Sequence, residues 1–122
     1  MTLYMTKLSE HFTRGEFACR CQEDCGKDTV DIELLQALER LRGLFNKPIK
    51  ITSANRCAEH NKRVGGRPSS QHLLGKAADI QVSGIAPRRV QEVLKDIYPD
   101  RFGIGSYETF THIDVRGGRA RW

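Results

Sequence analysis

The chain has 122 residues, enough for one domain and not two, and its 39% hydrophobic and 29% charged residues are typical of a globular protein rather than a disordered or fibrous one. No apolar run approaches the roughly 20 residues of a membrane helix, and Lys7, Glu10 and His11 interrupt the apolar core that a signal peptide needs. The net charge of +5 favours anionic partners but selects none of them, and no nucleic-acid-binding motif accompanies it. We therefore expect a soluble monomer, made in the cytoplasm, that neither inserts into membranes nor binds nucleic acid.

The first half of the chain predicts one long helix after an irregular start. Residues 1–30 have no regular pattern beyond short helical turns near residues 8–12 and 14–17. Leucines recur at intervals of three and four over residues 31–45, where Asp31 can cap the first turn and Pro48 ends the segment. This stretch is the clearest helix in the sequence.

The rest of the chain alternates strands and helices, which predicts an α+β fold in a single domain. Pro87 suits the first turn of a second helix over residues 86–97. The other expected elements are a polar helical turn over 56–64, a loop over 67–75, and strands over 49–53, 77–82, 102–107 and 110–115.

Four cysteines leave three interpretations open. Cys19, Cys21 and Cys25 lie close together in an irregular stretch, and Cys57 follows much later. They could hold a structural metal, although Cys-x-Cys and Cys-x3-Cys are not the usual zinc-knuckle spacing. They could instead form a disulfide in an oxidising compartment, or remain reduced thiols.

A first candidate site lies in residues 70–79. His72 in a loop and Asp79 on the following strand can converge on one metal ion, because Gly75 permits the turn between them. Asp79 stands in the apolar run AADIQV, where an unpaired carboxylate would be costly. A metal ion or an arginine partner would remove that cost.

A second candidate site is the strand over residues 110–115. His112, Asp114 and Arg116 share one face of this strand, and Ile113 and Val115 face the core. With His72 and Asp79, His112 completes a set of two imidazoles and one carboxylate, which leaves a fourth position open and is typical of a catalytic zinc.

These residues resemble a known family. The segments ITSANRCAEHNKRVGGRPSSQHLLGKAADI and FTHIDVR are similar to the zinc D-Ala-D-Ala peptidases of family M15, and most similar to its small phage and bacterial muramoyl-peptidase branch. The likeness covers roughly residues 8–122. It implies a Hedgehog/DD-peptidase-like α+β fold, with a small antiparallel sheet flanked by helices and zinc in a groove.

The resemblance also assigns roles to residues. His72, Asp79 and His112 match the family's zinc ligands, and Arg56 matches the arginine that holds a substrate oxygen near the metal. Many members carry the catalytic carboxylate three residues before the last zinc histidine, but Thr109 occupies that position here. We expect Asp114 to accept the proton, because it shares a strand face with His112, and Glu108 is the alternative base.

The resemblance implies that the chain is a zinc peptidase acting on bacterial peptidoglycan, as an endolysin-like endopeptidase or a D,D-carboxypeptidase at the cell wall, with residues 1–122 as its single domain. The departure at Thr109 supports an alternative, a non-catalytic zinc-containing module that binds the wall. The sequence does not specify which bond is cut, or whether the protein comes from a phage or a bacterium.

Overall fold

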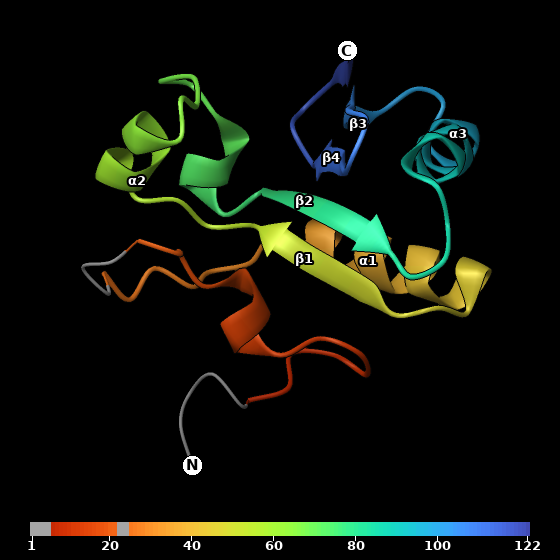
Figure 1. Ribbon diagram of the computed structural model, residues 1–122, viewed down its shortest axis with the longest axis horizontal. Helices are drawn as coiled ribbons and strands as arrows, with labels where there is room; N and C mark the ends of the chain where they lie inside the picture. The colour runs from red at the N-terminus through yellow and green to blue at the C-terminus, as the bar shows by residue number, and fades with distance from the viewer. Residues whose placement is uncertain (1–5, 22–24) are drawn as a thin grey trace.

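The computed structural model describes residues 6–21 and 25–122 and confirms the α+β class (Figure 1). The helical elements are η2 (Arg14–Phe17), α1 (Ile32–Phe45), α2 (Ala58–Arg63), η3 (Gln71–Leu74) and α3 (Pro87–Ile97). The strands are β1 (Ile49–Ser53), β2 (Ala77–Val82), β3 (Phe102–Ser106), β4 (Thr111–Asp114) and β5 (Arg119–Arg121).

The strands form one five-stranded mixed sheet in the order β1-β2-β4-β3-β5. The expected antiparallel pairing is found between β1 and β2, between β2 and β4, and between β4 and β3. The edge strand β5 instead pairs parallel to β3. The sequence did not predict β5, because a three-residue Arg-Ala-Arg strand has neither β-branched residues nor alternating hydrophobicity.

Two further details differ from the prediction. Residues 8–12 form no helical turn: Lys7 and Thr13 pair in an isolated bridge, and the Leu8 N–H donates to the Phe12 carbonyl. The expected loop over 67–75 contains η3, whose first turn is capped by the Ser70 hydroxyl. These short elements depend on a side-chain cap and on a backbone bridge, and neither produces a periodic hydrophobic pattern in the sequence.

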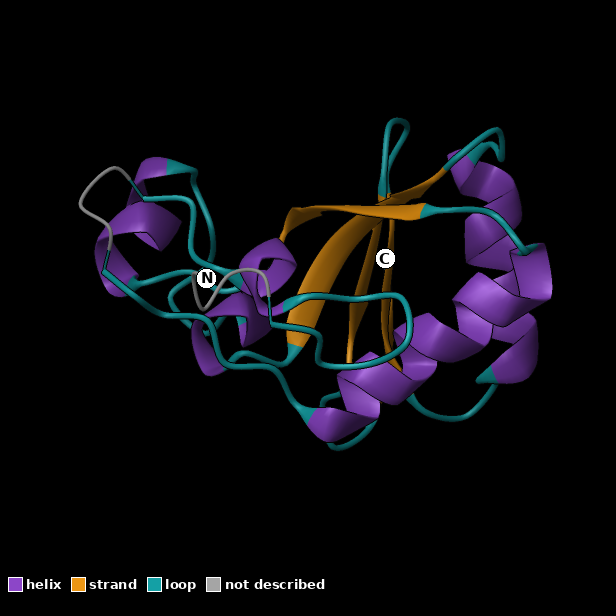
Figure 2. Ribbon diagram, turned by 90° about the horizontal axis from the view of Figure 1, so that it is seen from below, coloured by secondary structure: helices purple, strands orange, loops and turns teal. Residues whose placement is uncertain are grey.

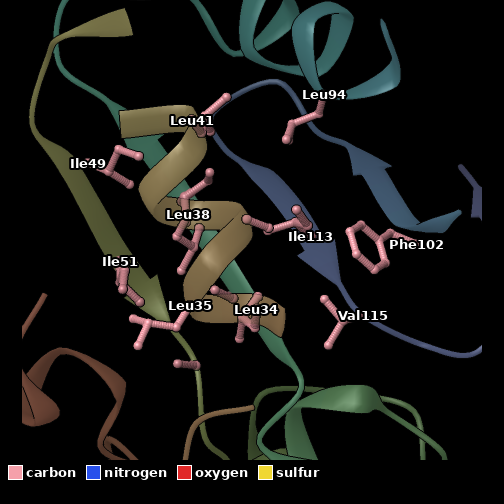
Figure 3. Packing of buried hydrophobic residues seen from close by; sticks show 14 of the residues in the cluster. Leu34, Leu35, Leu38, Leu41, Ile49, Ile51, Leu94, Phe102, Ile113 and Val115 are labelled. Atoms are coloured by element: carbon pink, nitrogen blue, oxygen red, sulfur yellow. The ribbon is translucent and has the colours of Figure 1, made fainter. Parts of the chain in front are cut away.

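Helix α1 covers one face of the sheet. The Asp31 carboxylate accepts a hydrogen bond from the Glu33 N–H at 2.8 Å and caps the helix as expected. The buried leucines of α1 point toward strand residues such as Ile51 and Ile113 (Figure 3). In Figure 2, α1 and α3 lie together on one side of the strands, and the short helical segments gather on the other side.

Strand alternation separates this core from the opposite face of the sheet. On β2, Ala78 and Ile80 belong to the hydrophobic core, and on β4 Ile113 does so. Their neighbours Asp79 and His112 therefore project from the opposite face. The two central strands thus carry polar, chemically reactive side chains on the face that α1 does not cover.

None of the helices in the described ranges 6–21 and 25–122 is both long and apolar enough to span a membrane.

Candidate metal centre

Three metal-ligating side chains meet where η3 approaches the central strands. Asp79 on β2 and His112 on β4 are direct cross-strand partners in the antiparallel register. His72 comes from η3, which immediately precedes β2. One donor atom from each of the three side chains lies within 4.8 Å of the others, and all three residues are buried.

The backbone fixes the orientation of the His72 ring. Its Nδ1 lies 2.6 Å from the Ala54 carbonyl oxygen, and because a carbonyl can only accept, Nδ1 must carry the proton. The Nε2 atom then faces the Asp79 Oδ1 at 3.3 Å. The unprotonated Nε2 and the Asp79 Oδ1 are both acceptors, so they need a proton or a cation between them. The orientation of the His72 ring is therefore suited to a metal ion.

Asp79 is the carboxylate at the middle of the cluster. Its Oδ1 also lies 3.0 Å from the His112 Nδ1, and its Oδ2 lies 3.3 Å from the Arg56 guanidinium. Burial raises the pKa of Asp79, but its contacts with His112 and His72 outweigh burial and hold the pKa well below the usual range. These contacts favour the ionised carboxylate, and Arg56 is the partner expected for a carboxylate in this apolar run.

His112 is held from its other side by Asp114. The His112 Nε2 lies 2.7 Å from the Asp114 Oδ2, and since a carboxylate only accepts, Nε2 carries the proton and Nδ1 is free to face a metal ion. Burial lowers the pKa of His112, but the two neighbouring carboxylates raise it overall. A histidine that donates one N–H to a carboxylate and turns its other nitrogen to the cluster is typical of zinc sites.

The donor set fits zinc. Two imidazole nitrogens and one carboxylate oxygen converge, and the outer nitrogen of each imidazole is held by a carbonyl or a carboxylate. Three protein donors leave a further position open, as catalytic rather than structural zinc requires.

The cluster opens into a cavity of about 600 Å³. Arg56, Arg67 and Arg116 line this cavity, so its walls are positively charged. Among the described residues that line it, Asp79 is the only carboxylate. The cavity therefore combines the three metal-ligating side chains with a surface suited to an anionic ligand.

Comparison with known proteins identifies the family. The sequence model of the family described as peptidase M15 matches residues 10–114, which is most of the chain and includes all three residues of the cluster. The chain belongs to the peptidase M15 family.

Curated relatives of this M15 chain include the peptidoglycan L,D-endopeptidase MepK of Escherichia coli strain K12 and that of Shigella flexneri. Each is 28% identical over 98 residues, which cover 75% of this chain and 54% of the relative. The chain thus spans about half the length of the curated relatives it matches.

Asp114 contacts His112 of the candidate metal centre (His72, Asp79 and His112, called the M15 centre below) but does not line the cavity. Asp114 is completely buried, and one of its oxygens faces His112 while both oxygens accept from the Arg116 guanidinium at 2.7 and 2.8 Å. Burial raises the pKa of Asp114, but these partners hold it well below the usual range. Asp114 does not line the cavity, and its oxygens face His112 and Arg116, so this geometry favours a role in holding His112 over the expected role as proton acceptor.

Glu108, the alternative base, lies in the chain between two residues that line the cavity. It is exposed and lies in the turn between β3 and β4, next to Tyr107, which lines the cavity together with Phe110. Glu108 itself does not line the cavity in this conformation. Its side chain would need to turn inward to reach the metal cluster.

An aromatic wall beside His72, Asp79 and His112 was not predicted from the sequence. The Trp122 ring lies 5.1 Å from the His112 ring, and its Nε1 donates to the Tyr107 hydroxyl at 3.0 Å. Tyr107 stacks on Phe110 with the ring centres 4.4 Å apart. The signal was weak: Trp122 reaches the site only because β5 pairs with β3, and β5 was not predicted.

Two glycines of β3 make room for this face. Gly103 pairs with Asp114 and Gly105 pairs with His112. A Cβ at Gly103 would lie 2.5 Å from the Asp114 carboxylate, and one at Gly105 would lie 2.7 Å from the Trp122 ring. Side chains at these positions would displace the groups that support His112.

We therefore expect Gly103→Ala to weaken metal binding about tenfold, because the displaced Asp114 no longer orients His112. Zinc titration monitored by calorimetry measures the effect, and Gly43→Ala on the exposed side of α1 is the control, since a Cβ there meets nothing within 4 Å. An unchanged zinc affinity in Gly103→Ala would show that Asp114 does not position His112.

Proposed function

We propose that this chain is a zinc-dependent peptidase that hydrolyses peptide bonds in the stem peptides or cross-links of bacterial peptidoglycan. The observation that carries the proposal is the convergence of His72, Asp79 and His112 on the wall of a cavity, in a chain of the M15 family. The relatives named peptidoglycan L,D-endopeptidase support peptidoglycan as the substrate class and favour an endopeptidase over a D,D-carboxypeptidase.

The three clustered side chains would hold the zinc ion, with His72 and His112 each bound through the nitrogen that faces Asp79. When bound, zinc lowers the pKa of a water molecule and polarises a carbonyl group. The protein's part is to fix the ligands: Ala54 orients His72, Arg56 orients Asp79, and Asp114 orients His112.

Arg56 has a second proposed role, because it both contacts Asp79 and lines the cavity. Its guanidinium is steadied by the Ser53 hydroxyl at 3.2 Å and the Asn61 side-chain oxygen at 3.3 Å. A fixed cationic donor beside the metal cluster suits the oxygen that gains negative charge when a peptide carbonyl is attacked. Arg67 and Arg116 extend the positive surface toward the carboxylates of a stem peptide.

We assign the proton transfer to Glu108. Asp79 is needed as a ligand and Asp114 is enclosed by His112 and Arg116, so we take Glu108, which adjoins the lining residue Tyr107, as the base among the described carboxylates. Its turn is short and exposed, which allows the side chain to swing inward when substrate binds. In that position it would take a proton from the attacking water and return it to the leaving amine.

The aromatic wall would shape the substrate side of the cavity. Tyr107, Phe110 and Trp122 present flat surfaces against which a peptide backbone can lie, whatever the chirality of its residues. Excluding water there also strengthens the charge interactions of Arg56 with substrate. We also propose that residues 1–122 form a single domain, that the protein works as a monomer, and that it acts at the cell wall.

Digestion of purified peptidoglycan tests the function. We expect the zinc-loaded protein to release new amino termini, and a chelator to stop the release until zinc is restored. Binding to peptidoglycan without any cleavage would favour the non-catalytic wall-binding module instead. Retention on DNA that survives moderate salt, without cleavage of peptidoglycan, would point to a nucleic-acid-binding protein.

A further inference from the structure

The four cysteines form a second cluster, separate from the residues assigned above. Cys19, Cys21 and Cys25 come from the segment after η2, and Cys57 immediately precedes α2. All four sulfur atoms lie within 4.8 Å of one another, and none is in a disulfide. Segments more than thirty residues apart therefore bring four soft ligand atoms to one point.

Backbone groups point at these sulfurs. The Cys57 N–H donates to the Cys19 sulfur at 3.3 Å, and the Cys25 N–H approaches the Cys21 sulfur at 3.5 Å. The Cys19 N–H in turn donates to the Lys27 carbonyl at 2.8 Å, which closes the segment around the cluster. Backbone N–H groups directed at sulfur stabilise the thiolate, the form that binds metal ions.

The pKa values of two thiols in the cluster are shifted in opposite directions. The hydrogen bond from the Cys25 backbone is the main cause that lowers the pKa of Cys21 to about 7. At Cys25 a backbone hydrogen bond from Lys27 acts in the same direction, but burial and the neighbouring sulfurs of Cys21 and Cys19 raise its pKa to about 12. Four thiolates within 4.8 Å of one another repel, and a cation between them would remove that repulsion.

We propose that Cys19, Cys21, Cys25 and Cys57 bind one structural zinc ion. Four thiolates are the donor set of a closed structural zinc site, which leaves no position open for a substrate. The spacing of Cys19, Cys21 and Cys25 differs from that of a zinc knuckle, but this site is built from two segments. Cys57, which follows β1 in the chain, supplies the fourth sulfur.

The position of this site suggests its role. Cys57 adjoins Arg56, the residue that contacts Asp79 in the M15 centre. The cysteine-bearing segment is also tied to β1 by Arg20, whose guanidinium donates to the Ile51 carbonyl at 2.9 Å. A zinc ion in the cysteine cluster would therefore fasten the N-terminal segment to the loop that carries Arg56.

Metal content and cobalt spectra test the proposal. Protein purified under reducing conditions with zinc is expected to hold about two ions per chain. Replacing zinc by Co²⁺ should give an intense sulfur-to-cobalt charge-transfer band, which histidine and carboxylate ligands cannot produce. His72→Ala should lose one ion and keep this band, whereas Cys25→Ser should lose the band and keep the other ion.

The thermal midpoint supplies an independent readout. Chelation of the His72→Ala protein, whose remaining ion is in the cysteine cluster, should lower the unfolding midpoint, since a ligand of the folded state stabilises it. One zinc per wild-type chain, with no charge-transfer band on cobalt substitution, would overturn the proposal. Two disulfides would also overturn it. In that case the mass of the purified, unreduced protein would be lower by four hydrogens, and metal analysis would find no second ion.

Discussion

Replacing His72 or His112 by alanine is expected to abolish peptidase activity, with a fall in kcat/KM of at least ~10³-fold. Each change leaves only two of the three clustered donors, too few to keep zinc at a catalytic site. The loss is large because a bound metal contributes several kcal/mol to transition-state stabilisation, and each ~1.4 kcal/mol is a factor of ten in rate. Release of new amino termini from peptidoglycan measures the activity, and metal analysis of the same samples measures zinc.

His60→Ala is the matched control. His60 lies on α2 and does not line the cavity, so this variant should keep both activity and its zinc. Tight retention of the M15-centre zinc in both His72→Ala and His112→Ala would mean that the ligands are wrongly assigned. Because a cysteine-bound zinc would remain in all three variants, the cobalt spectrum must accompany the metal count.

Asp114→Asn and Glu108→Gln are expected to fail in different ways. Asp114→Asn should weaken zinc binding about 10–100-fold, because the neutral amide holds His112 and Arg116 less firmly. Its activity should recover largely in excess zinc. Glu108→Gln should keep its zinc affinity but lower kcat by ~10²-fold or more at saturating zinc, the usual scale for loss of acid–base catalysis.

Zinc titrations and kcat measurements at several zinc concentrations separate the two effects. Thr109→Ala, in the same turn, is the control for Glu108 and should change kcat little. A normal kcat in Glu108→Gln, together with an Asp114→Asn protein that keeps zinc and stays inactive, would return the role of proton acceptor to Asp114.

The convergence of His72, Asp79 and His112 could be predicted because it rests on local rules. A buried carboxylate in the strand AADIQV needs a partner, and the alternation of β4 turns His112 away from the core. Both rules hold within a few residues of sequence. The cross-strand pairing of Asp79 with His112 then follows from two adjacent antiparallel strands.

The role of Asp114 could not be predicted from the same rules. Alternation correctly places Asp114 on the face of His112, yet it does not say which atoms its carboxylate meets. That depends on Arg116, which accommodates both oxygens, and on Gly103, whose missing side chain leaves the space. The direction in which a side chain points on its face of the strand is set by packing, and the alternation of residues along the strand does not determine it.

The aromatic wall and the cysteine cluster could not be predicted from the sequence for another reason. Trp122 reaches His112 through the parallel pairing of β5 with β3, and Cys57, which follows β1 in the chain, meets three cysteines that precede α1. Contacts between segments far apart in the chain leave no periodic signal in either segment. The spacing of the cysteines along the sequence was therefore a poor guide to their arrangement in space.

Mass spectrometry of muropeptides after digestion tests the central claim most directly. Peptidoglycan treated with zinc-loaded protein should show stem peptides or cross-links cut at a peptide bond, with the glycan strands intact. The chelated protein and the His112→Ala variant should leave the muropeptide profile unchanged. An unchanged profile with the zinc-loaded wild type, or cleavage of the glycan instead of the peptide, would contradict a zinc peptidase centred on His72, Asp79 and His112.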